Sequence, residues 1–254
     1  MFFKSLFESN LKNKNIAGDI IYYNNLHSTN DELWSLYEKN KLDNKNLLVI
    51  TDNQIAGRGR GIKQWFSQPG KSITCSFLLN SIFSNNYFNL HALLIPVAIA
   101  EGIKKMAFID VGIKWPNDIM YKNKKLGGIL IESKGVNKIL NVGIGLNINE
   151  LEEDFPDDII DSAISLREIT GYPIQREPLL ALILNELNNL IEHNDAQLII
   201  NNWMKFCNHK NKKISFMQND QQITGVFESL NEFGHAIINH DGEFIDYDGV
   251  INIL

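Results

Sequence analysis

The segment from Leu90 to Met106, LHALLIPVAIAEGIKKM, constrains the fold of this chain more than any other feature. It predicts an α-helix that is apolar almost all round, so we expect it to lie in the core of the protein. With 254 residues, the chain is long enough for one large domain, or for a medium domain with a small appendage.

Composition and charge exclude several classes of protein. The hydrophobic fraction of 44% and the charged fraction of 21% are typical of a globular protein, and the net charge of −6 argues against bulk DNA binding. No apolar run approaches the roughly 20 residues of a membrane span, and the first residues, MFFKSLFESNLKNK, do not predict a signal peptide. Cys75 and Cys207 are far apart and outside any Cys-x-x-Cys motif, which predicts neither a disulfide framework nor a zinc site. We expect a cytoplasmic protein.

Short apolar or alternating runs predict strands before and after the central helix. The runs are Ile20–Tyr23, Leu47–Thr51, Ser72–Leu79, Lys138–Ile148 and a hairpin of Asp118–Tyr121 with Lys125–Glu132. Helices are expected at Glu177–Glu192 and Ala196–Phe206. A further amphipathic helix carries Leu33, and the spacing of Thr29 and Glu32 predicts a capping box at its start.

The tail from Lys212 has a different pattern. Its four or five brief alternating runs are separated by turns such as Asp241-Gly242 and predict a small all-β barrel. We therefore expect two domains, residues 1–207 and 208–254.

Three glycines and two arginines alternate in Gly57-Arg-Gly-Arg-Gly61. The loop lies between two predicted strands and has neither the P-loop ending nor the dinucleotide-binding spacing. Guanidinium groups on such a loop can bind phosphate or carboxylate, although a solvated hairpin loop is an equally good interpretation. Neither arginine has an acidic partner nearby in the sequence, so we expect both to stay solvated without an anion.

Two further segments combine glycine with polar side chains. In Lys114-Trp-Pro-Asn-Asp118, the Pro-Asn-Asp turn should aim Lys114 and Asp118 at one small volume, although it could equally be a turn with a packed tryptophan. Lys125 opens a strand that Gly127 and Gly128 interrupt, which marks close approach of a ligand or backbone, unless the lysine is only a solvated edge charge.

The strand that carries Gly143 and Gly145 ends on Asn147, and a bulge would also explain its glycines. No nucleophile elbow, Cys–His pair or metal-binding motif accompanies these segments. Lysine, arginine, glycine and amide groups favour chemistry by positioning and charge neutralisation, such as phosphoryl or nucleotidyl transfer.

Taken together, these motifs resemble the biotin protein ligases in order and spacing, over nearly the whole chain. The motifs are Ser28-Thr-Asn30, Gln54 with Gly57-Arg-Gly-Arg60, Trp65, Lys114-Trp-Pro-Asn-Asp118, Lys125-Leu-Gly-Gly-Ile-Leu130 and Gly143-Ile-Gly-Leu-Asn147. The resemblance implies an α+β fold, in which a mixed or antiparallel sheet with packed helices forms a class II synthetase-like catalytic domain. A C-terminal SH3-like barrel follows.

The same resemblance implies a two-step reaction. Biotin and ATP, with Mg²⁺, form biotinyl-5′-adenylate, which acylates a lysine of a biotin carboxyl carrier domain of acetyl-CoA carboxylase or a related carboxylase. The implied biotin-binding residues are Ser28, Thr29, Asn30, Gln54, Arg58, Gly59, Arg60, Lys125, Gly127 and Gly128. The implied nucleotide-binding residues are Arg58, Arg60, Trp65 and Asn147, and the implied catalytic residues are Lys125, Arg58, Arg60, Lys114 and Asp118, with no metal bound by protein side chains.

Two departures from the family pattern accompany this resemblance. Ile62 stands where the loop usually has glycine, and only about 18 residues precede the first strand, so we expect no DNA-binding domain of the winged-helix type. We expect a monomer or a homodimer. The alternatives are a lipoate or octanoate protein ligase, and a non-catalytic biotin or adenylate sensor. An octanoyltransferase would need a nucleophilic cysteine, and neither Cys75 nor Cys207 is well placed for that role.

Overall fold

A computed structural model describes residues 1–40, 46–61, 63–80, 82–83, 89–134, 139–218 and 220–254. Its centre is a seven-stranded sheet in the order β1-β2-β5-β9-β8-β7-β6, in which β1 and β2 are parallel and the other neighbours antiparallel. The strands are β1 (Asp19–Leu26), β2 (Leu47–Gln54), β5 (Ile73–Asn80), β6 (Gly112–Lys114), β7 (Asp118–Tyr121), β8 (Lys124–Lys134) and β9 (Ile139–Leu146). β3 (Gly57–Arg58) and β4 (Gln64–Trp65) form a separate two-stranded ladder, the β3–β4 hairpin.

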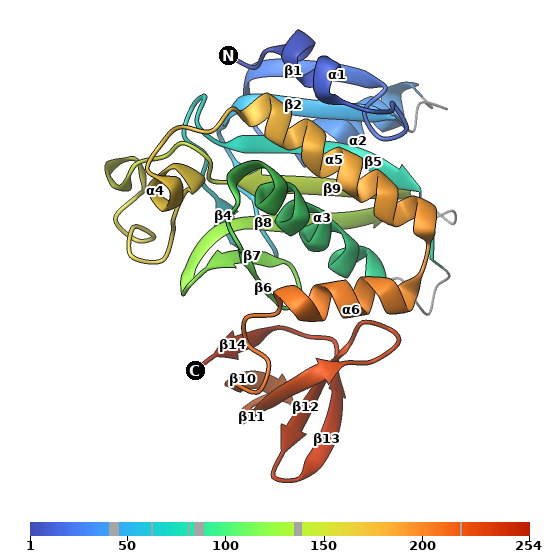
Figure 1. Ribbon diagram of the computed structural model, residues 1–254, viewed down its shortest axis with the longest axis vertical. Helices are drawn as coiled ribbons and strands as arrows, with labels where there is room; N and C mark the ends of the chain where they lie inside the picture. The colour runs from blue at the N-terminus through green and yellow to red at the C-terminus, as the bar shows by residue number, and fades with distance from the viewer. Residues whose placement is uncertain (41–45, 62, 81, 84–88, 135–138, 219) are drawn as a thin grey trace.

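Helices cover both faces of the sheet (Figure 1). On one face, α3 (Leu90–Ala107) packs against α5 (Arg176–His193) and α6 (Ala196–Phe206), with α1 (Lys4–Asn10) beside α5. The expected core position of α3 is confirmed, because 13 of its 18 residues are buried. On the other face, α2 (Thr29–Asn40) packs over β2, β5 and β9.

Alternation along each strand separates the two faces. In β2, Leu48 and Ile50 belong to the main core cluster that also contains the buried residues of α3, whereas Leu47 and Val49 pack in a smaller cluster with Leu33 of α2. In β9 the main core takes residues 140, 142, 144 and 146, which leaves Gly143 and Gly145 on the α2 face. On the α2 face, glycines therefore stand at two positions of β9 where an alternating strand would otherwise carry side chains.

The start of α2 differs from the sequence prediction. Ser28, not Thr29, caps the helix, because its Oγ accepts a hydrogen bond from the backbone N–H of Asp31 at 3.4 Å. Glu32 does not return to the cap and instead accepts a hydrogen bond from the hydroxyl of Tyr23 at 2.7 Å. The predicted capping box of Thr29 and Glu32 was wrong, because Ser28 directly precedes Thr29 and is an equally favourable capping residue.

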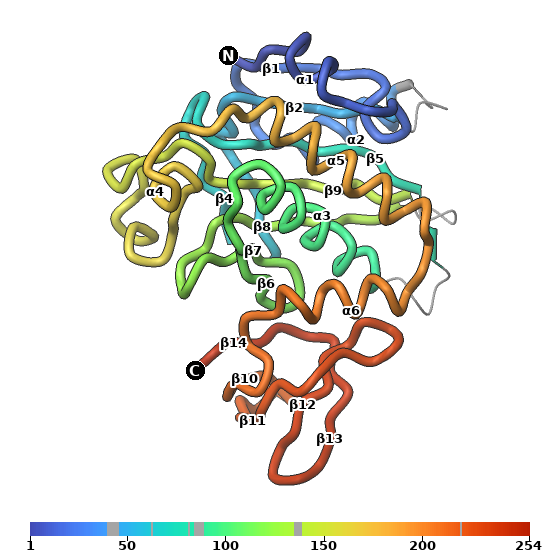
Figure 2. Tube along the Cα trace, viewed as in Figure 1, coloured from blue at the N-terminus to red at the C-terminus, as the bar shows by residue number. Residues whose placement is uncertain are grey.

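The C-terminal unit is a five-stranded antiparallel sheet, which lies beyond α6 at the β6 end of the large sheet (Figure 2). Its strands are β10 (Lys213–Gln218), β11 (Gln221–Leu230), β12 (Ala236–His240), β13 (Glu243–Tyr247) and β14 (Ile251–Ile253). Between β9 and α5 lie a 3-10 helix, η2 (Glu152–Asp154), and α4 (Leu166–Thr170). The predicted α+β class, with a mixed sheet, packed helices and a small C-terminal β unit, is confirmed. Across the described residues, no helix is long and apolar enough to cross a membrane.

Candidate active site

A cavity of about 380 Å³ opens on the α2 face of the large sheet. Strands β5, β8 and β9 form its floor, and the start of α2, the β3–β4 hairpin and the β6–β7 turn form its walls. The described residues that line it include one carboxylate, Asp118, and five basic side chains, which are Arg58, Arg60, Lys63, Lys114 and Lys125. This imbalance favours anionic ligands.

Uncharged polar groups at one end of the cavity hold one another in place. Gln54 Oε1 accepts hydrogen bonds from the backbone N–H of Thr29 at 2.8 Å and from its hydroxyl at 3.1 Å. Ser76 Oγ lies 2.7 Å from Thr29 Oγ1 and 2.5 Å from Asn30 Oδ1. Ser28, Thr29 and Asn30 are buried. Fixed amide and hydroxyl groups of this kind suit a ligand with its own N–H and C=O groups.

Positions 143 and 145 require glycine, because other side chains fill the space that a Cβ atom at either position would occupy. A Cβ at Gly143 would lie 2.3 Å from Asn30 Oδ1, and one at Gly145 would lie 2.4 Å from Trp65 Cε2. Strand β9 pairs with β5 and β8 without a register shift across both positions, so a bulge does not explain the glycines. The groups that approach β9 closely at these glycines are the side chains of Asn30 and Trp65.

The β6–β7 turn brings Lys114 and Asp118 together, as the sequence predicts, because the two residues are cross-strand neighbours. Lys125 Nζ lies 2.6 Å from Asp118 Oδ1, and a Cβ at Gly128 would lie only 3.3 Å from that same nitrogen. Burial lowers the pKa of Lys114, Asp118 opposes that shift, and the charges of Lys63 and Lys125 add to it. Lys114 and Lys125 thus flank a single carboxylate, and the charge of Lys63 acts on Lys114.

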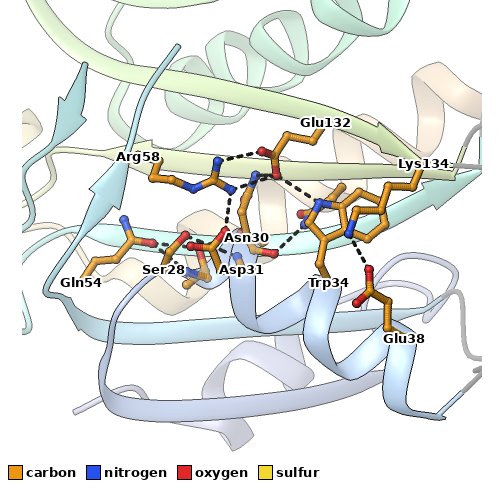
Figure 3. A network of polar contacts seen from close by, with 12 residues as sticks. Ser28, Asn30, Asp31, Trp34, Glu38, Gln54, Arg58, Glu132 and Lys134 are labelled. Atoms are coloured by element: carbon orange, nitrogen blue, oxygen red, sulfur yellow. Dashed lines mark hydrogen bonds and ion pairs between the residues drawn. The ribbon is translucent and has the colours of Figure 1, made fainter. Parts of the chain in front are cut away.

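Arg58 is paired with carboxylates and is not free in solvent (Figure 3). Its Nη2 lies 2.7 Å from Asp31 Oδ1, and its Nη1 lies 2.9 Å from Glu132 Oε1. The expectation that both arginines stay solvated was therefore wrong for Arg58, because its partners are 27 and 74 residues away in the sequence. The described residues provide no such carboxylate for Arg60.

The structure adds residues that the sequence motifs did not single out. Lys63 lines the cavity from the loop that also carries Arg58 and Arg60, and its positive charge is the only sequence signal that could have marked it as a site residue. Val250, Ile251 and Asn252 reach the cavity from the C-terminal sheet, and no local pattern marks them as site residues. Trp115 Nε1 donates to the carbonyl oxygen of Gly234 at 3.3 Å, which joins the β6–β7 turn to that sheet.

Two predicted site residues lie outside the cavity lining. Asn147 is buried, and its Nδ2 donates to the carbonyl oxygens of Ile164 at 3.2 Å and Lys125 at 3.4 Å. A Cβ at Gly127 would lie 2.3 Å from a methyl carbon of Leu146. Both residues shape the strand ends around Lys125 in this structure, and their contacts with a ligand stay a prediction. Ile62 lies outside the described residues.

The donor set suits a metal ion carried by the substrate. Within the described part of the chain, no three or more His, Cys, Asp or Glu side chains are grouped so that they could hold a metal ion, and Asp118 is a single carboxylate in the cavity lining. Mg²⁺ that arrives on nucleotide phosphates needs no protein cage of its own.

Neither cysteine is placed to act as a nucleophile. Burial raises the pKa of Cys75 to about 12 and that of Cys207 to about 11, and neither residue is among those that line the cavity.

Comparison with known proteins places this cavity in a family context. Residues 22–149 match the model of the biotin/lipoate A/B protein ligase family. The bifunctional ligase/repressor BirA of Bacillus subtilis is 36% identical over 178 residues, which are 68% of this chain and 54% of BirA. This chain therefore spans about half the length of that relative.

Solved structures give the same picture. The biotin protein ligase from Aquifex aeolicus in complex with biotin and ATP superposes with a TM-score of 0.80 and is 26% identical, covering 93% of this chain and 98% of that one. The ligase from Leishmania major in complex with biotinyl-5-AMP shares the fold, with a TM-score of 0.65, 24% identity and coverage of 93% and 98%. The family match covers half of the sequence and includes most of the cavity, so the chain belongs to the biotin/lipoate A/B protein ligase family.

Proposed function

We propose that this chain is a biotin protein ligase, which uses ATP to attach biotin to one lysine of a biotin carboxyl carrier domain. The main support is a cavity in which Arg60, Lys63, Lys114 and Lys125 face one lining carboxylate, Asp118, next to an uncharged polar end. A ligand with a polar ring system and a terminal carboxylate would place the ring at the polar end and the carboxylate among the cations.

The first step brings two anions together. An oxygen of the biotin carboxylate attacks the α-phosphorus of ATP, the bond from that phosphorus to the oxygen shared with the β-phosphate breaks, and pyrophosphate leaves. Mg²⁺ bound to the nucleotide would neutralise phosphate charge. In this proposal Arg60, Lys114 and Lys125 neutralise the reacting groups, and Asp118 holds Lys125 in place through their 2.6 Å contact. Ser28, Thr29, Asn30 and Gln54 bind the ureido ring.

The second step transfers the biotinyl group. The neutral amine of the carrier lysine attacks the carbonyl carbon of the mixed anhydride, the bond to AMP breaks, and the amine proton passes to the departing phosphate or solvent. The enzyme forms no covalent bond in either step, which agrees with the raised pKa values and the position of the two cysteines. Carrier domains of acetyl-CoA carboxylase or a related carboxylase are the proposed partners.

The proposed function can be tested by comparing biotin with the acids that the alternative enzymes would use. Pyrophosphate release from ATP should be measured with biotin, lipoate or octanoate as the only added acid, together with mass-spectrometric detection of the acyl adenylate. We expect release with biotin alone. Preference for lipoate or octanoate would assign the chain to the other branch of the family, and no release with any acid would support the sensor.

A further inference from the structure

Arg58 points toward carboxylates of its own chain, although the family pattern assigns it to the ligand. We propose that Arg58 is a latch that holds the β3–β4 hairpin against the sheet at the cavity, and that Glu132 is the positioning residue that anchors it. The inference rests on the proposed function only for its effect on ligand release, because the latch itself is present without any ligand.

The latch joins three elements. Arg58 belongs to β3, Asp31 to the first turn of α2, and Glu132 to β8. The guanidinium makes three contacts, with Nη2 2.7 Å from Asp31 Oδ1 and 3.1 Å from Glu132 Oε2, and Nη1 2.9 Å from Glu132 Oε1. The two contacts with Glu132 are bidentate, which is the strongest geometry for a guanidinium and a carboxylate.

Glu132 is held from its other side as well. Its Oε2 accepts hydrogen bonds from Asn30 Nδ2 and Trp34 Nε1, both at 3.1 Å (Figure 3). Although burial opposes ionisation, the hydrogen bonds from Arg58, Asn30 and Trp34 lower the pKa of Glu132. Its side chain is 26% exposed, against 57% for Asp31, so Glu132 is the better-shielded partner of Arg58.

The contacts of Glu132 continue into the polar end of the cavity. Because Asn30 Nδ2 donates to Glu132, its Oδ1 is left facing Ser76 Oγ, 2.5 Å away and above Gly143. Ser76 in turn contacts Thr29, which binds Gln54 at the start of the loop that carries the hairpin. A single chain of polar contacts thus links the hairpin, through Glu132, to the groups proposed to bind the ureido ring.

These contacts make Arg58 a poor candidate for the principal ligand-binding cation. To reach an anion in the cavity, it would have to leave a bidentate carboxylate and expose the charge of a partly buried Glu132. Arg60 has no such partner among the described residues and can turn to a ligand at no comparable cost. We therefore assign the anion to Arg60 and the attachment of the hairpin to Arg58.

Amide hydrogen exchange of the ligand-free protein tests the latch without any substrate. We expect R58Q and E132Q each to speed exchange of the β3 and β4 amides by about tenfold, as loss of a half-exposed charge-assisted pair allows. The double variant should be no faster than either single variant, since both remove the same contact. D31N should give a smaller increase, because it leaves Glu132 in place.

The matched control is E38Q, which removes another acid from α2 that pairs with Lys134 and not with Arg58. It should leave hairpin exchange unchanged, and β9 amides should stay protected in every variant. Release of preformed adenylate should accelerate equally in R58Q and E132Q. Unchanged hairpin exchange in E132Q would overturn the latch. Weaker ATP binding in R58Q with wild-type binding in E132Q would also overturn it, because Arg58 would then contact the ligand. Failure of biotin activation in the wild type would leave the exchange result standing.

Discussion

At the scale of single residues, the cavity depends on how few carboxylates face its cations. Lys125 and Lys114 share Asp118, and the described lining offers no second acid to neutralise them. Anionic ligands would therefore be stabilised more strongly in this cavity than in water, because the positive charges are already in position. Lys125 contacts Asp118 at the start of β8, 2.6 Å away. We expect it to contribute more than the other cations to the stabilisation of the reacting anions.

Replacing Lys125 by alanine should lower the rate of adenylate formation by at least about a hundredfold, as loss of one preorganised charge does in comparable sites. The matched control is Lys124→Ala, the preceding residue of β8, which does not line the cavity. Pre-steady-state pyrophosphate release would measure both variants. A near-wild-type rate for the Lys125 variant would show that its assigned role is wrong.

Most residues of the site could be predicted from the sequence because they occur in short motifs. Arg58, Lys114, Asp118 and Lys125 were predicted in this way and line the cavity, and the β6–β7 turn brings Lys114 and Asp118 together, while their roles toward a ligand stay predictions. Glu132 and Asp31 could not be found, since their proximity to Arg58 depends on how α2 and β8 meet across the sheet. Local patterns report local geometry, and the partners of a charge are often distant in sequence.

At the scale of elements, alternation and connection lengths predicted most helices and strands. The helix expected at 196–206 is confirmed with the same bounds as α6. The helix expected at 177–192 is α5, which is one residue longer at each end. The short α1 was missed because seven residues in a polar context carry little periodicity. The connection after α6 is less obvious in the sequence, and it holds a buried histidine.

His209 is fully buried between α6 and β10, with its ring centroid 4.3 Å from that of Phe227 and 5.9 Å from that of Trp203. Burial lowers the pKa of His209 to about 4 from 6.5, and the charges of Lys114 and Lys212 add to the shift. Between pH 6.5 and 4, His209 is protonated in the unfolded chain and neutral in the folded protein. The free energy of unfolding should therefore fall as pH drops from 6.5 to 4, by up to about 1.4 kcal/mol per pH unit.

Urea unfolding of the wild type and of His209→Gln between pH 7.5 and 5, a range chosen around the usual histidine pKa of about 6.5, would isolate this contribution. The variant should show a shallower dependence on pH. His193→Gln, at the exposed end of α5, is the control and should keep the wild-type slope. If the free energy of unfolding depends on pH equally in the wild type and the His209 variant, protonation of His209 is not linked to stability.

At the scale of the whole molecule, the C-terminal sheet is part of the active-site wall. Residues 250–252 line the cavity, and Trp115 contacts both Gly234 and Tyr247 from the β6–β7 turn. The division at residue 207 that the sequence predicts stays a prediction, because buried residues such as Trp203, His209 and Phe227 connect the two parts. The C-terminal unit should therefore affect catalysis directly.

Asn252→Ala should lower the rate of adenylate formation or transfer by several-fold, because Asn252 is a polar residue of the C-terminal sheet that lines the cavity. The control is Gln222→Ala, an exposed residue of β11 on the same sheet that does not line the cavity. Steady-state kinetics with biotin, ATP and carrier would compare the two. Equal rates would show that residue 252 is only a neighbour of the site.

A single-turnover transfer experiment tests directly whether this chain is a biotin protein ligase. The enzyme is loaded with labelled biotin and ATP, freed of excess substrate, and mixed with a purified biotin carboxyl carrier domain or with the same domain carrying arginine in place of its acceptor lysine. We predict that the label moves from the enzyme to the lysine-bearing carrier alone, with release of AMP. An adenylate that stays bound and never reaches the carrier would contradict the ligase and favour the sensor.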